Sequence, residues 1–307
     1  MENLLEGFVT IGAVIALGTL MAQIGILDNH AGLMLSRLAF FVATPALLVT
    51  VLGRADVHRV LSRNLAASAA AVIVCSVLYV LAARLFWRLD LADTVVGTLC
   101  AAYVNAGNLG LPIAAYVLGD AALVAPTMLM QLLVMQPLAL AMLDHATSER
   151  RFSLARAMMR PLTNPMTIGS MLGLLLAVTG ATLPGAVRDP LELVGGMAVP
   201  SMLLAYGISL RLGGRPGEGT SIGQIGYITV LKLVVQPVTA YVVGRFALGL
   251  DETQLLAVTL LAALPTAQNI FVHATRYGRG EVMARDSIFV TTVLSVPVLV
   301  VVATLVD

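Results

Sequence analysis

The chain has 307 residues, of which 59% are hydrophobic and only 11% are charged, and its formal net charge is +1. Soluble globular domains have about 25% charged residues, so this composition excludes a soluble protein and predicts an integral membrane protein. The near-neutral charge gives no indication of a nucleic acid partner. Apolar runs of about twenty residues without alternation favour membrane-spanning helices over the strands of a barrel.

The apolar runs predict an all-α fold with ten membrane-spanning helices. In chain order these lie at residues 6–26, 33–53, 65–87, 92–118, 122–143, 163–181, 190–210, 222–247, 253–276 and 284–306. The N-terminal stretch MENLLEGFVT is acidic and has no basic region, so we expect the first span to be retained as a helix and not cleaved as a signal peptide.

The basic residues between the spans predict the orientation of the chain, because cytoplasmic connections are rich in Lys and Arg. With the N-terminus outside, the outer connections hold five arginines and the inner connections hold twelve. The outer five are Arg54, Arg59, Arg63, Arg188 and Arg245, and the inner twelve are Arg37, Arg84, Arg88, Arg150, Arg151, Arg156, Arg160, Arg211, Arg215, Arg276, Arg279 and Arg285. We therefore expect a multi-pass protein of the cell inner (plasma) membrane, with both termini outside the cytoplasm.

The same topology divides the chain into two halves of five spans each. Residues 1–147 form the first five-helix repeat, 148–161 (SERRFSLARAMMRP) a basic cytoplasmic linker, and 162–307 the second five-helix repeat. Five spans followed by five make the second half enter from the opposite side, which predicts an inverted repeat. A weak sequence trace supports it, since ATPALLVTVLGR at 43–54 resembles AVPSMLLAYGIS at 198–209.

The fourth span is interrupted by YVNAGNLGLP at 103–112, and the ninth by LPTAQN at 264–269. Proline removes a backbone N–H and breaks the helix, and freed backbone at membrane depth is tolerated only inside protein or beside a wet cavity. Interrupted spans at corresponding positions of two halves indicate a transport site, although a single proline kink can be purely structural. The residues predicted to hold a solute there are Asn105, Gly107, Asn108, Pro112, Pro265, Thr266, Gln268 and Asn269.

Lys232 lies near the middle of the eighth span. A lone cation in the membrane costs on the order of 3 kcal/mol or more, so Lys232 should face a cavity or a partner. Thr229, Gln236 and Thr239 fall on the same helical face and would form a polar stripe with it. Lys232 is predicted to offset the charge of an anionic solute. The alternatives are a lysine that extends to the interface, or one that caps carbonyls of a broken helix.

Two further polar residues are weaker candidates for the site. Gln131 in the fifth span either lines the cavity or bonds a neighbouring helix. His273 follows the second break by one turn and is a candidate for proton coupling, or a packed hydrogen-bond donor. The sequence has no His-Glu-x-x-His motif, no Gly-x-Ser-x-Gly motif and no paired acids within a span, so we expect no enzyme activity, no metal site and no cofactor.

The stretches NAGNLGLPIAAYVLGD and LPTAQNIFVHATRYG resemble the auxin efflux carrier family in its bacterial branch, and so does the lysine preceding VVQP in the eighth span. The resemblance covers essentially the whole chain. It implies carriage of organic anions such as malonate, malate-like acids or auxin, and a fold shared with bile-acid sodium symporters. It also implies a scaffold domain, a transport domain in which helices four and nine cross, and a homodimer. The plant carriers have Asn-Pro-Asn in the first break, whereas this chain has Asn105-Ala106-Gly107-Asn108.

We therefore expect a secondary carrier of small organic anions such as dicarboxylates or auxin-like acids, embedded in the lipid bilayer and working by alternating access with an elevator-like motion. Two alternatives remain open. The first is a sodium-coupled symporter of the bile-acid type, since sodium could bind unwound carbonyls at the breaks although no carboxylate is predicted at mid-membrane. The second is a membrane receptor that binds a ligand without transporting it. The sequence does not decide between uncoupled transport and coupling to Na+ or H+.

Overall fold

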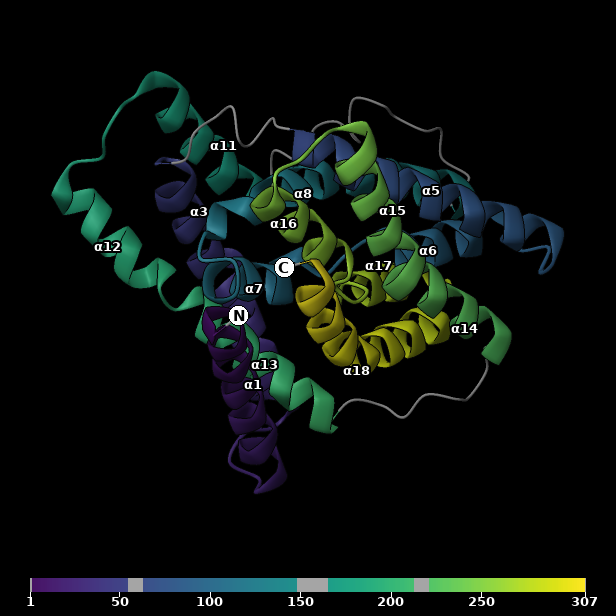
Figure 1. The fold of residues 1–307 in the computed structure, drawn as a ribbon. Helices are drawn as coiled ribbons and strands as arrows, with labels where there is room; N and C mark the ends of the chain where they lie inside the picture. The colour runs from purple at the N-terminus through teal and green to yellow at the C-terminus, as the bar shows by residue number, and fades with distance from the viewer. Residues whose placement is uncertain (1, 55–62, 148–164, 213–220, 307) are drawn as a thin grey trace. The chain divides into compact units, whose positions relative to one another are not determined.

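The computed structural model describes residues 2–54, 63–147, 165–212 and 221–306. Within these ranges the backbone forms helices and no β-strand, apart from one isolated bridge between two residues (Figure 1). The predicted all-α class is therefore confirmed. The predicted linker 148–161 lies outside the described residues, as do several of the arginines used to predict the orientation.

The chain divides into two compact units, and each takes segments from both halves of the sequence. The first unit comprises Met1–Ser62, Gly107–Leu129 and Pro161–Gly213, and the second comprises Arg63–Ala106, Met130–Arg160 and Gly214–Asp307. The predicted repeats, 1–147 and 162–307, would be related by symmetry, and a division into compact units does not test symmetry. The two repeats therefore stay a prediction.

The first unit consists of short and long helices around two close helix pairs. Its elements are α1 (Glu2–Gln23), α2 (Asn29–Leu38), η1 (Ala39–Ala43), α3 (Thr44–Leu52), η2 (Ala106–Gly110), α7 (Leu111–Tyr116), η3 (Ala121–Val124), α8 (Ala125–Met130), α11 (Pro165–Thr179), α12 (Gly185–Gly195) and α13 (Ala198–Leu212). Helix α1 packs along α13, and α3 packs along α11 (Figure 1).

Glycines allow these two helix pairs to approach closely. A Cβ atom added at Gly169 of α11 would lie 2.6 Å from the carbonyl oxygen of Pro45 on α3, and one added at Gly207 of α13 would overlap the carbonyl oxygen of Ile15 on α1. The Thr19 hydroxyl also donates to the carbonyl oxygen of Gly207 at 3.0 Å. Small residues at such contacts are typical of membrane helices, where van der Waals packing replaces the hydrophobic effect.

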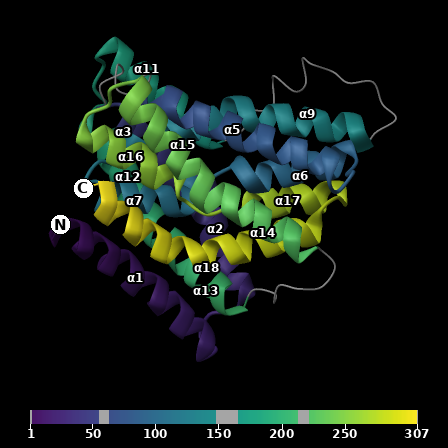
Figure 2. The ribbon, with the colours of Figure 1, turned by 45° about the vertical axis from the view of Figure 1, so that its right-hand side comes forward.

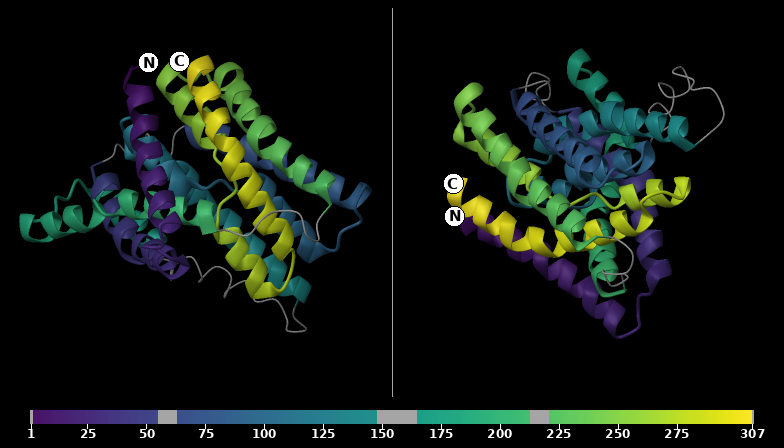
Figure 3. Two further views of the ribbon diagram at one scale, coloured as in Figure 1. Left: turned by 90° about the horizontal axis from the view of Figure 1, so that it is seen from below. Right: turned by 90° about the vertical axis from the view of Figure 1, so that its right-hand side faces the viewer.

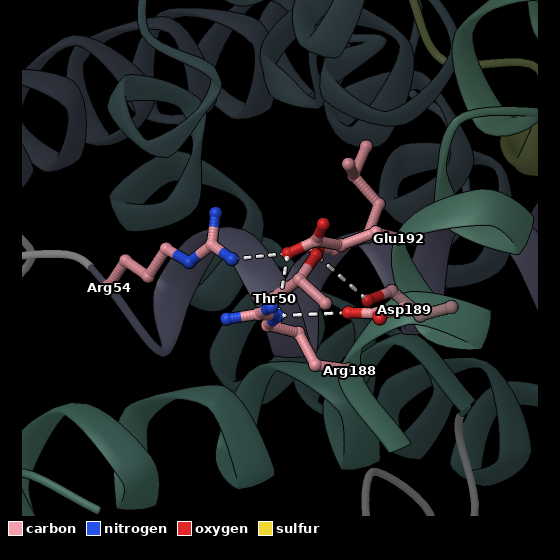
Figure 4. Close-up of polar contacts among 7 residues, drawn as sticks. Thr50, Arg54, Arg188, Asp189 and Glu192 are labelled. Atoms are coloured by element: carbon pink, nitrogen blue, oxygen red, sulfur yellow. Dashed lines mark hydrogen bonds and ion pairs between the residues drawn. The ribbon is translucent and has the colours of Figure 1, made fainter. Parts of the chain in front are cut away.

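Polar contacts connect the end of α3 to α12 in this unit (Figure 4). Arg54 forms an ion pair with Glu192 of α12, and Arg188 lies 3.2 Å from Asp189 and 3.7 Å from Glu192. Their side chains are between 41% and 67% exposed, so each pair contributes no more than about 1 kcal/mol to stability.

The second unit contains longer helices, the first part of the interrupted fourth span and both parts of the interrupted ninth span. Its elements are α5 (Arg63–Leu85), α6 (Leu91–Ala102), η4 (Gln131–Met135), α9 (Gln136–Thr147), α14 (Ile222–Val230), η6 (Leu231–Val235), α15 (Gln236–Val242), η7 (Val243–Ala247), α16 (Glu252–Ala262), α17 (Asn269–Tyr277) and α18 (Glu281–Val306). Helices α5, α6 and α9 run side by side (Figure 2), and α18 lies along α14 (Figure 3).

Six stretches of the described residues form helices that are long and apolar enough to cross a membrane. They are Asn29–Leu52, Arg63–Leu85, Ala121–Thr147, Gly185–Ile208, Ile222–Ala247 and Glu281–Val306, and they match six of the ten predicted spans. Shorter apolar helices, Gly12–Gln23, Leu91–Ala102, Pro165–Thr179 and Glu252–Ala262, occupy the other four predicted positions. Two of these four are the interrupted spans, so their shortness follows from the breaks. Ten spans in inverted repeats stay a prediction.

Several long helices change to a π-helical turn just before a proline. The backbone N–H of Thr44, Gln136 and Gln236 each donates to the carbonyl five residues earlier, and each of these residues directly precedes a proline. A proline ring clashes with the carbonyl four residues before it, and the wider turn moves that carbonyl away. Each helix thus continues past its proline, and a polar residue is placed at the turn.

Candidate functional site

The two interrupted spans meet each other inside the second unit. Helix α6 ends at Ala102 and α16 ends at Ala262, and beyond these ends Val104 and Thr266 form an antiparallel bridge. The Asn105 N–H donates to the carbonyl oxygen of Pro265 at 2.8 Å, and the Ala267 N–H donates to that of Tyr103 at 3.2 Å. Extended backbone from one break thus supplies hydrogen-bond partners for the other, which is necessary where water is scarce.

Side chains from three other segments satisfy the carbonyl groups that the end of α6 leaves free. The Thr266 hydroxyl donates to the carbonyl oxygen of Cys100 at 2.7 Å. The Gln236 amide donates to that of Ala102 at 3.1 Å, and the Gln131 amide donates to that of Val104 at 3.0 Å. All three donors are buried, so each prevents the cost of an orphaned carbonyl, about 1–3 kcal/mol.

Lys232 is the buried cation of this region, with a side chain that is 0% exposed. Its Nζ donates to the Gln236 Oε1 at 3.0 Å, and the Gln236 Nε2 faces the carbonyl oxygen of Ala102. An ammonium only donates and a carbonyl only accepts. The Gln236 amide must therefore point its oxygen at Lys232 and its nitrogen at Ala102. Lys232 therefore does not extend to an interface, and it is connected through Gln236 to the carbonyl end of α6.

The members of the predicted polar stripe around Lys232 differ in their hydrogen bonds, and Gln236 is the one that bonds Lys232. The hydroxyl of Thr229 donates to the carbonyl of Ile225 at 2.8 Å and that of Thr239 to the carbonyl of Val235 at 2.7 Å. The π turn η6 lies between these threonines and adds a residue to the helical period. Both hydroxyls therefore bond their own helix, and their position on the same face as Lys232 stays a prediction.

The second break places its polar residues at the start of α17. Pro265 and Thr266 are buried, whereas Gln268 and Asn269 are half-buried. The Thr266 N–H donates to the hydroxyl of Thr291 at 3.1 Å. The break is therefore held by buried threonines, and its two amide side chains lie at the more exposed end.

Side-chain contacts of Tyr103 connect the first break to the second break and to α9. The side chain of Asn269 forms a hydrogen bond with that of Tyr103, and the Tyr103 hydroxyl donates to the Gln136 Oε1 at 3.4 Å. Asn105 is 3% exposed, and its backbone N–H donates to the Pro265 carbonyl of the second break. Asn105, Gln268 and Asn269 thus belong to one region of the second unit.

Three of the predicted site residues belong to the first unit. Gly107 and Asn108 lie in the π turn η2 and are half-buried, and Pro112 is buried in the first turn of α7. A Cβ atom at Gly107 would meet the methyl carbon of Met166 at an ordinary 3.7 Å. Their participation in a shared solute site stays a prediction.

The weaker candidates have distinct positions. Gln131 is 2% exposed and bonds the Val104 carbonyl, which agrees with the alternative of a hydrogen bond to a neighbouring helix. His273 is half-buried on α17, one turn beyond Asn269. No group of three or more His, Cys, Asp and Glu suited to a metal occurs among the residues that the structure describes.

The sequence reasoning missed Gln136 and Thr291 and did not assign Gln236 to the site. A signal was present, because a Gln-Pro pair follows an apolar run at both 136–137 and 236–237. Each glutamine directly follows a π turn and reaches the first break. A glutamine directly before a proline in a membrane span therefore indicates a hydrogen bond from its side chain to a neighbouring span that is interrupted.

Comparison with known proteins assigns the chain to a class that fits this geometry. Residues 4–303 match the model of the family described as "Membrane transport protein", so the chain belongs to that family. This is the auxin efflux carrier family that the two break motifs resemble, and that identification is confirmed. The chain is thus a multi-pass membrane protein of a transporter family.

Two relatives match over almost their full length. A protein of Rhizobium meliloti (strain 1021) with the name "Putative malonate transporter" is 27% identical over 289 residues, which cover 92% of this chain and 89% of the relative. An "Uncharacterized transporter" of Methanothermobacter thermautotrophicus is 25% identical over 297 residues, which cover 94% of each chain.

Proposed function

We propose that the protein is a secondary carrier of small organic anions, with dicarboxylates such as malonate as the first candidates. The observation that carries this proposal is the pairing of the two breaks, Val104 with Thr266, beside the buried Lys232. Membership in a family of membrane transport proteins supports it, and the name of the Rhizobium relative suggests the substrate class.

The charges near the breaks favour an anion. The hydrogen-bond partner of Lys232 is the uncharged amide of Gln236, so that contact does not neutralise the ammonium. Helix α17 begins at the second break, and the N-terminus of a helix carries a partial positive charge. A carboxylate near Gln268 and Asn269 would be attracted by both. The ammonium acts through its electric field, since its side chain is fully buried.

The amide groups of Asn105, Gln268 and Asn269 are the proposed solute contacts within the second unit. Their amides can donate to a carboxylate and accept from a hydroxyl. Pro265 and Thr266 belong to the extended backbone that carries Gln268 and Asn269. Gln131, in the π turn η4 before α9, donates to the Val104 carbonyl of the first break. Gly107, Asn108 and Pro112 continue the first break within the first unit, and their role as solute contacts stays a prediction.

Transport would proceed by alternating access with an elevator-like motion, in a homodimer of the inner membrane with both termini outside. An inside-negative potential expels one negative charge by about 2.3 kcal/mol per 100 mV, so anion efflux needs no coupling ion. Sodium coupling and proton coupling through His273 are the rival arrangements. Flux measured with and without sodium, across a pH gradient and under an imposed potential distinguishes the three.

Flux of radiolabelled malonate into proteoliposomes tests the proposal directly. We expect saturable uptake by the wild-type protein, and at least about tenfold slower uptake for Lys232→Ala, since tenfold corresponds to only ~1.4 kcal/mol. Lys232→Met keeps the side-chain volume and separates loss of charge from loss of packing. Arg188→Ala, which removes an exposed arginine of the first unit, is the control and should transport normally. Unaltered flux in Lys232→Ala would remove Lys232 from the mechanism.

A further inference from the structure

The far end of α17, away from the second break, is fixed by a cluster of charged and aromatic side chains. Arg279 follows α17 and forms ion pairs with Asp90 and, at 3.2 Å, with Asp93. The Tyr277 hydroxyl donates to the Asp144 Oδ1 at 2.6 Å. We call these five residues the α17 clamp. All belong to the second unit, and none is among the site residues predicted from the sequence.

Both ends of α17 are attached to opposite ends of α6. The Ala267 N–H bonds the carbonyl of Tyr103 beyond the C-terminus of α6, whereas Arg279 bonds Asp90 and Asp93 at its N-terminus. The two helices therefore run antiparallel, and Figure 2 shows them side by side. Two attachments at opposite ends restrict both sliding and rotation of α17, which one attachment at the break would not.

The local geometry of the clamp supports a fixed position. Asp90 caps α6 by accepting the Asp93 N–H at 2.9 Å with one carboxylate oxygen, and its other oxygen meets Arg279. Gly280 has a φ of +61°, and a Cβ there would lie 2.9 Å from the Val96 side chain of α6. The turn after α17 is thus packed directly against α6.

A helix as short as α17 needs such attachments. It has nine residues, fewer than half of the roughly twenty that a helix needs to cross a membrane by itself, so contacts with neighbouring helices must fix its position. At 1.5 Å per residue it is about 14 Å long, so a displacement at Tyr277 is transmitted to Asn269 at the other end.

We propose that Asp90, Asp93, Asp144, Tyr277 and Arg279 are positioning residues, which hold α17 so that Gln268 and Asn269 face Asn105 with the spacing that the solute requires. This proposal rests on the proposed solute site for its kinetic consequence. Its structural consequence, the restricted motion of the start of α17, does not depend on transport.

The test uses Gln268→Cys as a reporter in the full chain, labelled with a maleimide. Cys75 and Cys100 are fully buried, and the protein without the reporter gives the background. Arg279→Glu places three carboxylates together, and we expect it to speed labelling severalfold. Adding Asp93→Arg again places one guanidinium between two carboxylates, and we expect labelling to return to the reference rate. Arg188→Glu in the first unit is the matched charge reversal and should have no effect.

The kinetic arm uses the same substitutions without the reporter. Because a displacement of about 1 Å can cost up to a hundredfold in rate, we expect Arg279→Glu to raise KM for malonate about tenfold and the charge swap to restore it. If the residues had a merely structural role, Arg279→Glu would lower the yield of folded protein, and adding Asp93→Arg would not restore KM. If Arg279→Glu does not fold, Tyr277→Phe removes only the hydroxyl that donates to Asp144 and should also speed labelling.

Two results would overturn the proposal: labelling at the reference rate in Arg279→Glu or in Tyr277→Phe, or a charge swap that folds but restores neither readout. Absence of malonate flux in the wild-type protein, with clamp-dependent labelling intact, would instead refute the proposed function and leave the clamp in place.

Discussion

At the residue scale, the first break leaves backbone carbonyls without helical partners, and particular side chains donate hydrogen bonds to them. The carbonyls of Cys100, Ala102 and Val104 each accept from a buried side chain on a different segment. Gln236 has a double function, because it accepts from Lys232 while it donates to Ala102. A residue with only one of these capacities cannot replace it.

Gln236→Glu tests this double function. A carboxylate can accept from Lys232 but cannot donate to the Ala102 carbonyl, so we expect a loss of about 1–3 kcal/mol in stability and a lower melting temperature in detergent. The control Gln23→Glu makes the same change at an exposed position at the end of α1 and should shift the melting temperature far less. An equal shift in both variants would argue against the Gln236 bond.

The sequence indicated the residues of this region better than it indicated their partners. Lys232 was expected near the break because a charge at mid-span is costly, and the structure places it there, connected through Gln236. The face shared with Thr229 and Thr239 stays a prediction, and a π turn between the two threonines alters the helical period locally. A constant period of 3.6 residues cannot anticipate such a turn.

At the element scale, helix contacts in the first unit depend on the absence of side chains. Gly169 and Gly173 lie four residues apart on α11, and added Cβ atoms would approach the carbonyls of Pro45 and Leu48 to 2.6 Å each. This is the small-xxx-small arrangement that lets membrane helices pack closely. The motif is visible in the sequence, but its partner helix α3 is not.

Gly169→Ala and Gly12→Ala form a matched pair of substitutions for this contact. An alanine Cβ at 169 must displace the α3 backbone, and we expect a loss of about 1–3 kcal/mol. At Gly12 of α1 nothing lies within 4 Å, so alanine should be neutral or stabilise the helix by up to about 1 kcal/mol. Melting temperatures in detergent measure both. A destabilised Gly12→Ala with an unchanged Gly169→Ala would reverse the interpretation.

At the scale of the whole molecule, the two helix pairs of the first unit are related by an exchange of spans between the two halves of the sequence. In the first unit, the first predicted span packs on the seventh and the second on the sixth, as α1 with α13 and α3 with α11. Exchanging span one with six and span two with seven converts one pair into the other. An inverted repeat produces this relation, so the packing supports the repeat as a prediction.

The predicted orientation can be tested with single cysteines and a membrane-impermeant maleimide on intact cells. We expect Thr182→Cys, in the exposed connection between α11 and α12, to be labelled from outside. Ser153→Cys, in the predicted cytoplasmic linker, should be labelled only after permeabilisation, because positively charged loops stay inside. The reverse labelling would invert the topology, and labelling of both in intact cells would reject the assignment of the linker.

The sequence by itself determined the membrane class, the helical fold and the positions of the two breaks, because apolar length, proline and glycine act on the chain locally. Only the tertiary structure decided that Val104 pairs with Thr266, that Gln131 and Gln236 bond carbonyls of the first break, and that Arg279 fixes α17 to α6. The physical reason is that a free carbonyl can bond any nearby donor, and a buried cation can bond any nearby acceptor. Which partner it finds depends on which helices pack beside it.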